Sequence, residues 1–143
     1  DAGRHVAMLC EGDPMLYGSF MYVLQRLGSA YPVEVIPGVS SLGAAAAAAL
    51  LPLVSRQQTL SIIPATLPGP ELKTQLTPGH AVAIFKVGRH LDKIRRVLQG
   101  LGRADDAVFV ERASLPDCRV LPLNDVPNGS NYFAMVLVPG VIQ

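Results

Sequence analysis

The sequence predicts an α/β fold in two parts, on three observations. Near the amino terminus, an apolar run, a turn and a helix-spaced apolar segment occur twice in succession. This order is typical of parallel strands joined by crossover helices. The later part holds several short apolar runs separated by turn-rich segments, which indicates a mixed, partly antiparallel sheet. A polar stretch at 54–58 separates the two, so we predict the C-terminal part of a first α/β domain at 1–55 and a second α/β domain at 56–143.

In the first part, each element follows from the spacing of its apolar residues. The predicted elements are a strand at 5–10, a helix over 15–27, a strand at 33–36 and a helix at 42–51. Gly28 is expected to end the first helix in a left-handed conformation. Ser40 or Ser41 is expected to cap the second, which Pro52 ends. The alanines at 44–49 favour a helix lying close to a sheet, the alternative being room for a bulky ligand.

In the second part, strands and helices alternate less regularly. The strands are expected at 60–63, 80–87, 107–110, 119–123 and 132–138, with a short helix at 71–76 and a longer one at 91–101. The longer helix has apolar residues at helical spacing and is expected to end at Gly102.

The composition excludes several classes of protein. Of the 143 residues, 50% are hydrophobic and only 16% are charged, which is the opposite of a disordered chain. The net charge of +1 argues against nucleic acid as a partner. The longest uncharged apolar run, 42–54, is shorter than the ~20 residues that a membrane span needs. With no signal peptide recognisable, we expect a cytoplasmic protein that binds neither nucleic acid nor membrane.

The cysteines and histidines form no pattern typical of a metal site. Cys10 and Cys118 are widely separated and are interpreted as reduced thiols. His5, His80 and His90 have no partners for a metal site or a catalytic triad, and are interpreted as structural or surface residues. We therefore expect no protein-bound metal.

Two loops follow the predicted strands of the first part, where open parallel sheets bind their ligands. The first begins Glu11-Gly12-Asp13-Pro14, and the second runs from Ile36 to Ser41. Taken alone, each sequence is explained by helix capping. Glycine at such a turn also lets another molecule approach the backbone.

Four motifs together are more specific than either loop. They are GDPMLYGS at 12–19, VIPGVSS at 35–41, KVGRHL at 86–91 and VERA at 110–113. The chain resembles the tetrapyrrole methylases on these motifs. The resemblance covers essentially the whole chain and implies a two-domain α/β fold with the active site between the domains. It also implies S-adenosylmethionine as methyl donor and a tetrapyrrole as small-molecule substrate.

The resemblance assigns site residues by position. Donor contacts are expected at Gly12, Asp13, Leu16, Tyr17, Ser40, Ser41, Val87 and Ala113. Lys86, Arg89 and Arg112 lie beside these positions and are expected to bind substrate carboxylates, the alternative being solvated surface charges. No catalytic base is assigned, because the donor sulfonium is already activated and the main task is positioning.

The third and fourth motifs favour one branch of the family. They imply methyl transfer to C20 of precorrin-2, or of its cobalt-containing counterpart, in cobalamin biosynthesis. The alternatives are methylation of another ring carbon or another substrate, or a noncatalytic ligand-binding module. Family members begin with a glycine- and proline-rich loop that has no match here, so we expect the chain to begin within the first domain. The resemblance also implies a homodimer.

Overall fold

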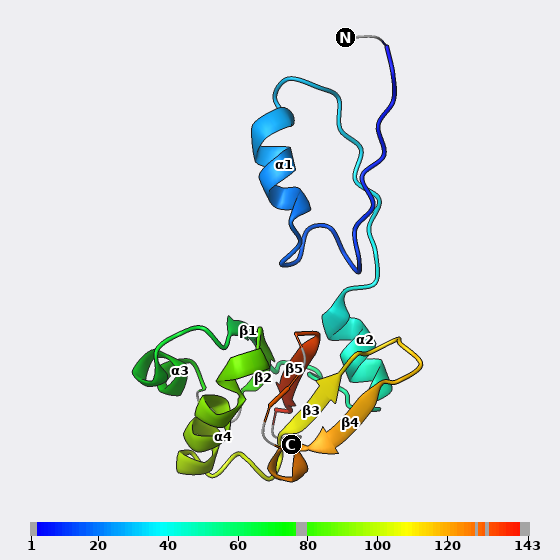
Figure 1. Ribbon diagram of the computed structural model, residues 1–143. Helices are drawn as coiled ribbons and strands as arrows, with labels where there is room; N and C mark the ends of the chain where they lie inside the picture. The colour runs from blue at the N-terminus through cyan, green and yellow to red at the C-terminus, as the bar shows by residue number, and fades with distance from the viewer. Residues whose placement is uncertain (1–2, 77–79, 128, 131, 141–143) are drawn as a thin grey trace. The chain divides into compact units, whose positions relative to one another are not determined.

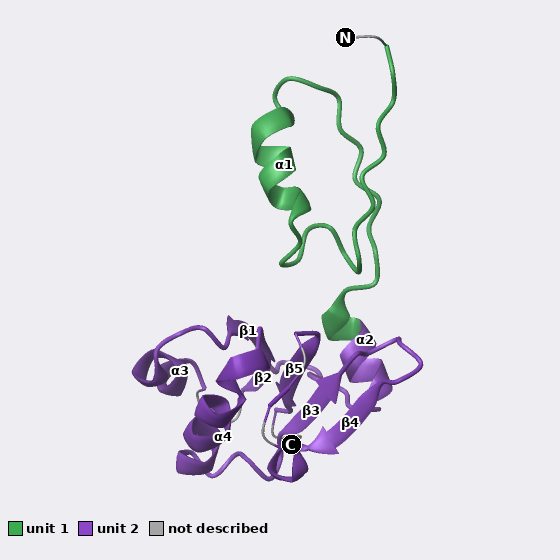
Figure 2. Ribbon diagram, viewed as in Figure 1, with its two compact units in different colours: residues 1–43 green, residues 44–143 purple. Residues whose placement is uncertain are grey.

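The computed structural model describes residues 3–76, 80–127, 129–130 and 132–140 (Figure 1). The chain divides into two compact units, residues 1–43 and 44–143 (Figure 2). The predicted boundary after residue 55 refers to the two domains that the family resemblance implies, and it stays a prediction. No helix among the described residues is long and apolar enough to cross a membrane.

The first unit contains helix α1 (Phe20–Leu27) and the start of helix α2 (Ser41–Ala48). The strands predicted at 5–10 and 33–36 were wrong for this structure, since neither segment forms a strand. The physical reason is that a strand needs hydrogen-bonded partners, and two short strands alone are only marginally stable in water. The apolar residues of these segments predicted strands, but no neighbouring strand is present to pair with either segment among the described residues.

Helix α1 is shorter than predicted, because residues 15–19 form turns and the helix begins only at Phe20. Gly28 does end it, with its N–H bonded to the Leu24 carbonyl at 2.8 Å. Its φ of −63° is right-handed, however, so the expected left-handed cap was wrong. None of the eight residues of α1 is buried.

Helix α2 has the predicted start. The Ser40 hydroxyl accepts a hydrogen bond from the Gly43 N–H at 3.3 Å, which is the N-cap interaction expected there. The helix ends at Ala48, before the predicted residue 51, and Leu50 adopts a positive φ of 50° just beyond it. Ala45 is fully buried, consistent with close packing of the small side chains.

The second unit holds one five-stranded sheet in the order β1-β2-β5-β3-β4. Its elements are β1 (Leu60–Pro64), α3 (Gly69–Gln75), β2 (Ala81–Phe85), η1 (Gly88–His90), α4 (Leu91–Gly100), β3 (Val108–Glu111), β4 (Arg119–Pro122), η2 (Leu123–Asp125) and β5 (Ala134–Val138). Among the described strands, β1 and β2 pair in parallel, and the other pairs are antiparallel. The predicted mixed sheet is confirmed.

The core of this unit lies between the sheet and helices α3 and α4. Strands β2 and β5 are buried along their whole length. Leu91, Ile94 and Leu98 are the buried residues of α4, as their spacing predicted. Gly102 follows the helix with a φ of +66°, as expected for its C-terminal residue.

The pairing fixes a common direction for three strands. Strand β2 is parallel to β1, and both β2 and β3 are antiparallel to the central strand β5. Strands β1, β2 and β3 therefore run the same way, and their carboxyl ends meet at one edge of the sheet. We call this edge, where β1 ends at Pro64, β2 at Phe85 and β3 at Glu111, the carboxyl edge. The loops described next begin there.

Candidate functional site

In the first unit, Asp13 connects the two loops that the sequence singled out. Its Oδ1 accepts a hydrogen bond from the Met15 N–H at 2.9 Å, within its own loop. Its Oδ2 accepts one from the Gly38 N–H at 3.0 Å, across 25 positions of sequence. The carboxylate thus acts as a bridge between backbone groups, a contact that no local pattern predicts.

The glycines of these loops permit a close approach of the two backbones. A Cβ added to Gly38 would lie 2.2 Å from the Gly12 carbonyl oxygen, which is far inside any real contact. Gly12 itself adopts a φ of +75°, in the region that favours glycine. Gly12 was predicted as a site residue, whereas Gly38 was not. In the structure, the backbone at Gly12 occupies the space that a side chain at Gly38 would need.

The other donor positions of the first unit lie on the same two loops. Leu16 is half-buried, and its N–H is 3.5 Å from the Asp13 carbonyl. Tyr17 is 40% exposed and holds a positive φ of 55°. Ser40 caps α2, and Ser41 is the exposed first residue of that helix. The structure thus brings the six predicted positions onto two tied loops, and their contacts with the donor stay a prediction.

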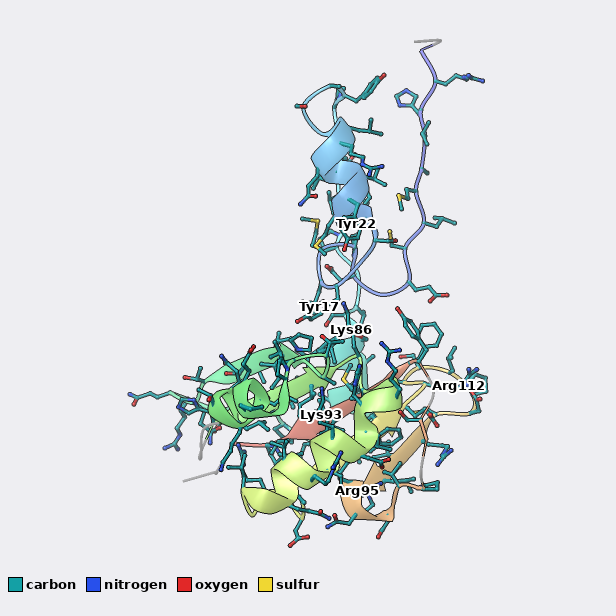
Figure 3. All side chains as sticks on the ribbon, turned by 60° about the vertical axis from the view of Figure 1, so that its left-hand side comes forward. Tyr17, Tyr22, Lys86, Lys93, Arg95 and Arg112 are labelled. Atoms are coloured by element: carbon teal, nitrogen blue, oxygen red, sulfur yellow. The ribbon has the colours of Figure 1, made fainter. Side chains whose placement is uncertain are left out.

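In the second unit, the remaining predicted residues gather at the carboxyl edge. Lys86, Val87 and Arg89 follow β2, and Arg112 and Ala113 follow β3. Figure 3 shows Lys86 and Arg112 towards the same end of this unit, with Arg95 at the other end. Residues from two separate motifs therefore belong to one face, as their position after strands predicted.

Both loops at this edge begin with a strained backbone. Lys86 and Arg112, each the first residue after its strand, have φ values of 58° and 55°. Non-glycine residues in this region cost about 1–3 kcal/mol and cluster at functional sites. The turn after Lys86 buries Val87 completely, and the Val87 carbonyl accepts the His90 N–H at 2.6 Å. Val87 belongs to the hydrophobic core of the unit, and its contact with the donor stays a prediction.

The electrostatics of the edge centre on Arg112. Its Nε lies 2.7 Å from Asp117 Oδ1 and 2.6 Å from Oδ2, and this hydrogen bond lowers the pKa of Asp117. Nearby, Arg119 pairs with the buried Glu111 at 3.2 Å. The pKa of His90 is lowered, mainly by burial and to a smaller extent by the charges of Lys93 and Arg89. Arg112 thus already holds one carboxylate, which is the group that it was predicted to bind in the substrate.

Sequence reasoning missed the segment that leads into β5. The Ser130 hydroxyl donates to the Gly88 carbonyl at 3.0 Å, and the Arg112 N–H donates to the Phe133 carbonyl at 2.8 Å. The segment therefore contacts both loops of the carboxyl edge. Two adjacent aromatic residues, Tyr132 and Phe133, were the available signal, but they were interpreted only as the start of a strand.

A separate hollow of about 680 Å³ lies at the opposite edge of the sheet, beside the end of α4 and η2. It is lined by Arg95, Gln99, Gly102, Ala104, Asp105, Asn124, Val126 and Pro127. None of the predicted site residues lines it. Among the described residues, no group of three or more His, Cys, Asp or Glu side chains could hold a metal ion, and Cys10 and Cys118 are free thiols.

Comparisons with known proteins bear on the same residues. The family model described as Tetrapyrrole (Corrin/Porphyrin) Methylases matches residues 1–126. The chain is 45% identical over 140 residues to Precorrin-2 C(20)-methyltransferase of a Sinorhizobium species, covering 97% of this chain and 57% of that protein. It is 44% identical over 141 residues to the cobalamin biosynthesis protein CobIJ of Mycobacterium tuberculosis, covering 98% of this chain and 28% of that protein.

Solved structures show the same likeness. A cobalt precorrin-4 methyltransferase, CbiF, is 28% identical with a TM-score of 0.68, over 90% of this chain and 61% of that one. A uroporphyrin-III C-methyltransferase from Thermus thermophilus, complexed with S-adenosylhomocysteine, is 30% identical with a TM-score of 0.62, over 89% and 62%. These matches confirm the expected fold class. The chain spans less than two thirds of each of these relatives, and it belongs to the tetrapyrrole methylase family.

Proposed function

We propose that the protein transfers a methyl group from S-adenosylmethionine to C20 of precorrin-2, or of its cobalt-containing counterpart, in cobalamin biosynthesis. One observation carries the proposal: the 45% identity to a precorrin-2 C(20)-methyltransferase extends over 97% of this chain. All four motifs that suggested the reaction lie within the described residues. Since the chain spans only 57% of that relative, the reaction is proposed for the whole protein.

The donor would be held mainly by backbone groups. The proposed contacts are Gly12, Asp13, Leu16, Tyr17, Ser40, Ser41, Val87 and Ala113. Gly12 and Gly38 support this proposal, because they let the two loops that carry six of these residues pack closely together. Both Asp13 oxygens already accept backbone N–H groups. A carboxylate has further lone pairs, so Asp13 can still accept a ribose hydroxyl.

The acceptor would be oriented by cations at the carboxyl edge. Precorrin-2 carries several carboxylates, and Lys86, Arg89 and Arg112 are the basic residues that follow β2 and β3. Arg112 is already paired with Asp117, so a substrate carboxylate that binds Arg112 would replace the Asp117 carboxylate.

The reaction asks for alignment more than for acid–base catalysis. Bound S-adenosylmethionine supplies a methyl group on an activated sulfonium, and C20 of the reduced macrocycle is electron-rich. Holding the two reactants in line can contribute about 7–11 kcal/mol to lowering the barrier. The tied loops of the first unit and the strained turns of the second are the positioning elements in this proposal. We assign no catalytic base.

We further propose that the whole protein acts as a cytoplasmic homodimer, which the family resemblance supports. A metal-free chain is also proposed, with cobalt entering only as part of the substrate.

The experiment is methylation by the full-length protein of precorrin-2, with a carbon-13 methyl label on the donor. We expect a single new methyl carbon, assigned by NMR to C20. A methyl at another carbon would support a different member of the family, and donor binding without any methylated product would support the noncatalytic alternative.

A further inference from the structure

The segment before β5 lies between the two loops that carry the proposed site residues of the second unit. Strand β5 is the central strand, with β2 on one side and β3 on the other. Ser130 is hydrogen-bonded to the loop after β2 through Gly88, and Phe133 to the loop after β3 through Arg112. Side chains at the start of β5 are therefore placed at the middle of the carboxyl edge.

Two aromatic rings stand at this position and are largely outside the core. Tyr132 is 79% exposed and Phe133 is 51% exposed. Their ring centroids are 5.2 Å apart with an interplanar angle of 83°, an edge-to-face pair. The five residues of β5 that follow are all buried, whereas these two rings are exposed to solvent. The packing of the unit therefore does not account for the pair.

The charges around the pair indicate what it binds. Lys86 is the first residue after one neighbouring strand and Arg112 the first after the other, so cations flank the aromatic pair. An apolar ring system that carries carboxylates at its periphery complements this arrangement. S-adenosylmethionine has one small aromatic base and a single carboxylate at the opposite end of the molecule, whereas the tetrapyrrole carries several carboxylates around one large ring system. The acceptor therefore fits this arrangement better than the donor.

We infer that Tyr132 and Phe133 form an aromatic wall against which the tetrapyrrole macrocycle lies, with its carboxylates directed to the flanking cations. The inference rests on the proposed function and extends it to residues that neither the motifs nor the comparisons assign. Aromatic contact supplies affinity for the macrocycle and fixes its orientation, while the donor is held by the other residues.

The test compares two ligands in the full-length protein carrying Tyr132→Ala and Phe133→Ala together. Uroporphyrin serves as a stable carboxylated macrocycle, with its Kd measured by calorimetry, and S-adenosylhomocysteine serves as the donor probe. We expect the Kd for uroporphyrin and the KM for precorrin-2 to rise about tenfold. The Kd for S-adenosylhomocysteine should stay within about twofold of the wild-type value.

Two further variants make the outcome decisive. Tyr132→Phe with Phe133→Tyr keeps both rings and should bind uroporphyrin nearly as the wild type does. Tyr31→Ala removes another exposed aromatic residue, 51% exposed beyond α1, and should change neither Kd. Unchanged uroporphyrin binding in the alanine variant, or an equal loss of both ligands, would overturn the inference. Failure of the wild type to methylate precorrin-2 would instead contradict the proposed function.

Discussion

Gly38 donates its backbone N–H to the carboxylate of Asp13 at 3.0 Å, although the two residues are 25 positions apart. The same carboxylate accepts the Met15 N–H, so one side chain holds the loop after residues 5–10 against the loop after residues 33–36. Neither of those segments is a strand, and the loops are therefore not fixed by a sheet between them. Among the described residues, the Asp13 carboxylate joins the two loops through this hydrogen bond.

Replacing Asp13 with alanine should separate the two loops. We expect a loss of about 1–2 kcal/mol in the free energy of unfolding, because two hydrogen bonds to a charged acceptor are removed at a partly exposed position. If binding of S-adenosylhomocysteine requires the two loops to be joined, a similar loss of free energy should weaken binding. Since about 1.4 kcal/mol corresponds to a factor of ten, the Kd should rise about tenfold. Chemical denaturation and calorimetry measure the two effects. Glu11→Gln, an exposed neighbour, is the control, and equal behaviour of the two variants would contradict the bridge.

Replacing Gly38 with alanine tests the close approach of the backbones. The added Cβ would lie 2.2 Å from the Gly12 carbonyl oxygen, and main-chain atoms on both sides cannot move cheaply. We expect about 2–3 kcal/mol of destabilisation, measured by denaturant unfolding. The φ of Gly38 lies outside the left-handed region, so the effect would come from contact alone.

Gly100→Ala is the matched control for this substitution. Gly100 is the last residue of α4, and an added Cβ there meets no atom within 4 Å. Because alanine is the better helix former, this variant should be as stable as the wild type or slightly more stable. A Gly38→Ala protein as stable as Gly100→Ala would contradict the packing described here.

Replacing Arg112 with glutamine should raise the pKa of Asp117 towards its ordinary value. The hydrogen bond from Arg112 is the largest cause of the lowered pKa, with a smaller contribution from its charge. Since the folded-state pKa is depressed, the pair stabilises the loop above the ordinary aspartate pKa. That contribution is lost as the pH falls through the folded-state value. A carbon-13 NMR titration of the Asp117 carboxyl measures the shift, with Arg96→Gln as control, and an unchanged pKa would refute the assignment.

Replacing Lys86 with glutamine should affect the acceptor and spare the donor. We expect the KM for precorrin-2 to rise about fivefold to tenfold, because one charge-assisted contact to a substrate carboxylate is lost. The Kd for S-adenosylhomocysteine should hardly change. Lys73→Gln, on the exposed part of α3, should change neither quantity. Steady-state kinetics at saturating donor separates the effects, and a rise in the donor Kd alone would argue that Lys86 is part of the donor site.

Much of the second unit could be predicted from the sequence, because its elements are local and strongly patterned. The spacing of Leu91, Ile94 and Leu98 predicted α4, and all three are buried. The apolar runs predicted all five strands to within a few residues. In the first unit the same reasoning placed strands at 5–10 and 33–36, and failed there because apolar content does not supply the partners that a ladder requires.

The candidate site was predicted in part for a similar reason. Gly12, Asp13 and Ser40 were singled out because they lie in loops that follow predicted strands, and the family resemblance then assigned them to the donor. The bond from Gly38 to Asp13 and the contacts of Ser130 and Phe133 join residues distant in the sequence. No periodicity or motif encodes such a contact, so these could only come from the three-dimensional structure.

The proposed donor contacts can all be tested in one experiment. The most direct test is a titration of the isotopically labelled full-length protein with S-adenosylhomocysteine, followed through its backbone amide NMR signals. We expect the largest shifts at Gly12, Asp13, Ser40, Ser41, Val87 and Ala113, and all of them should saturate with the same Kd. Shifts concentrated at other residues, such as those of the hollow lined by Arg95 and Asn124, would contradict these assignments.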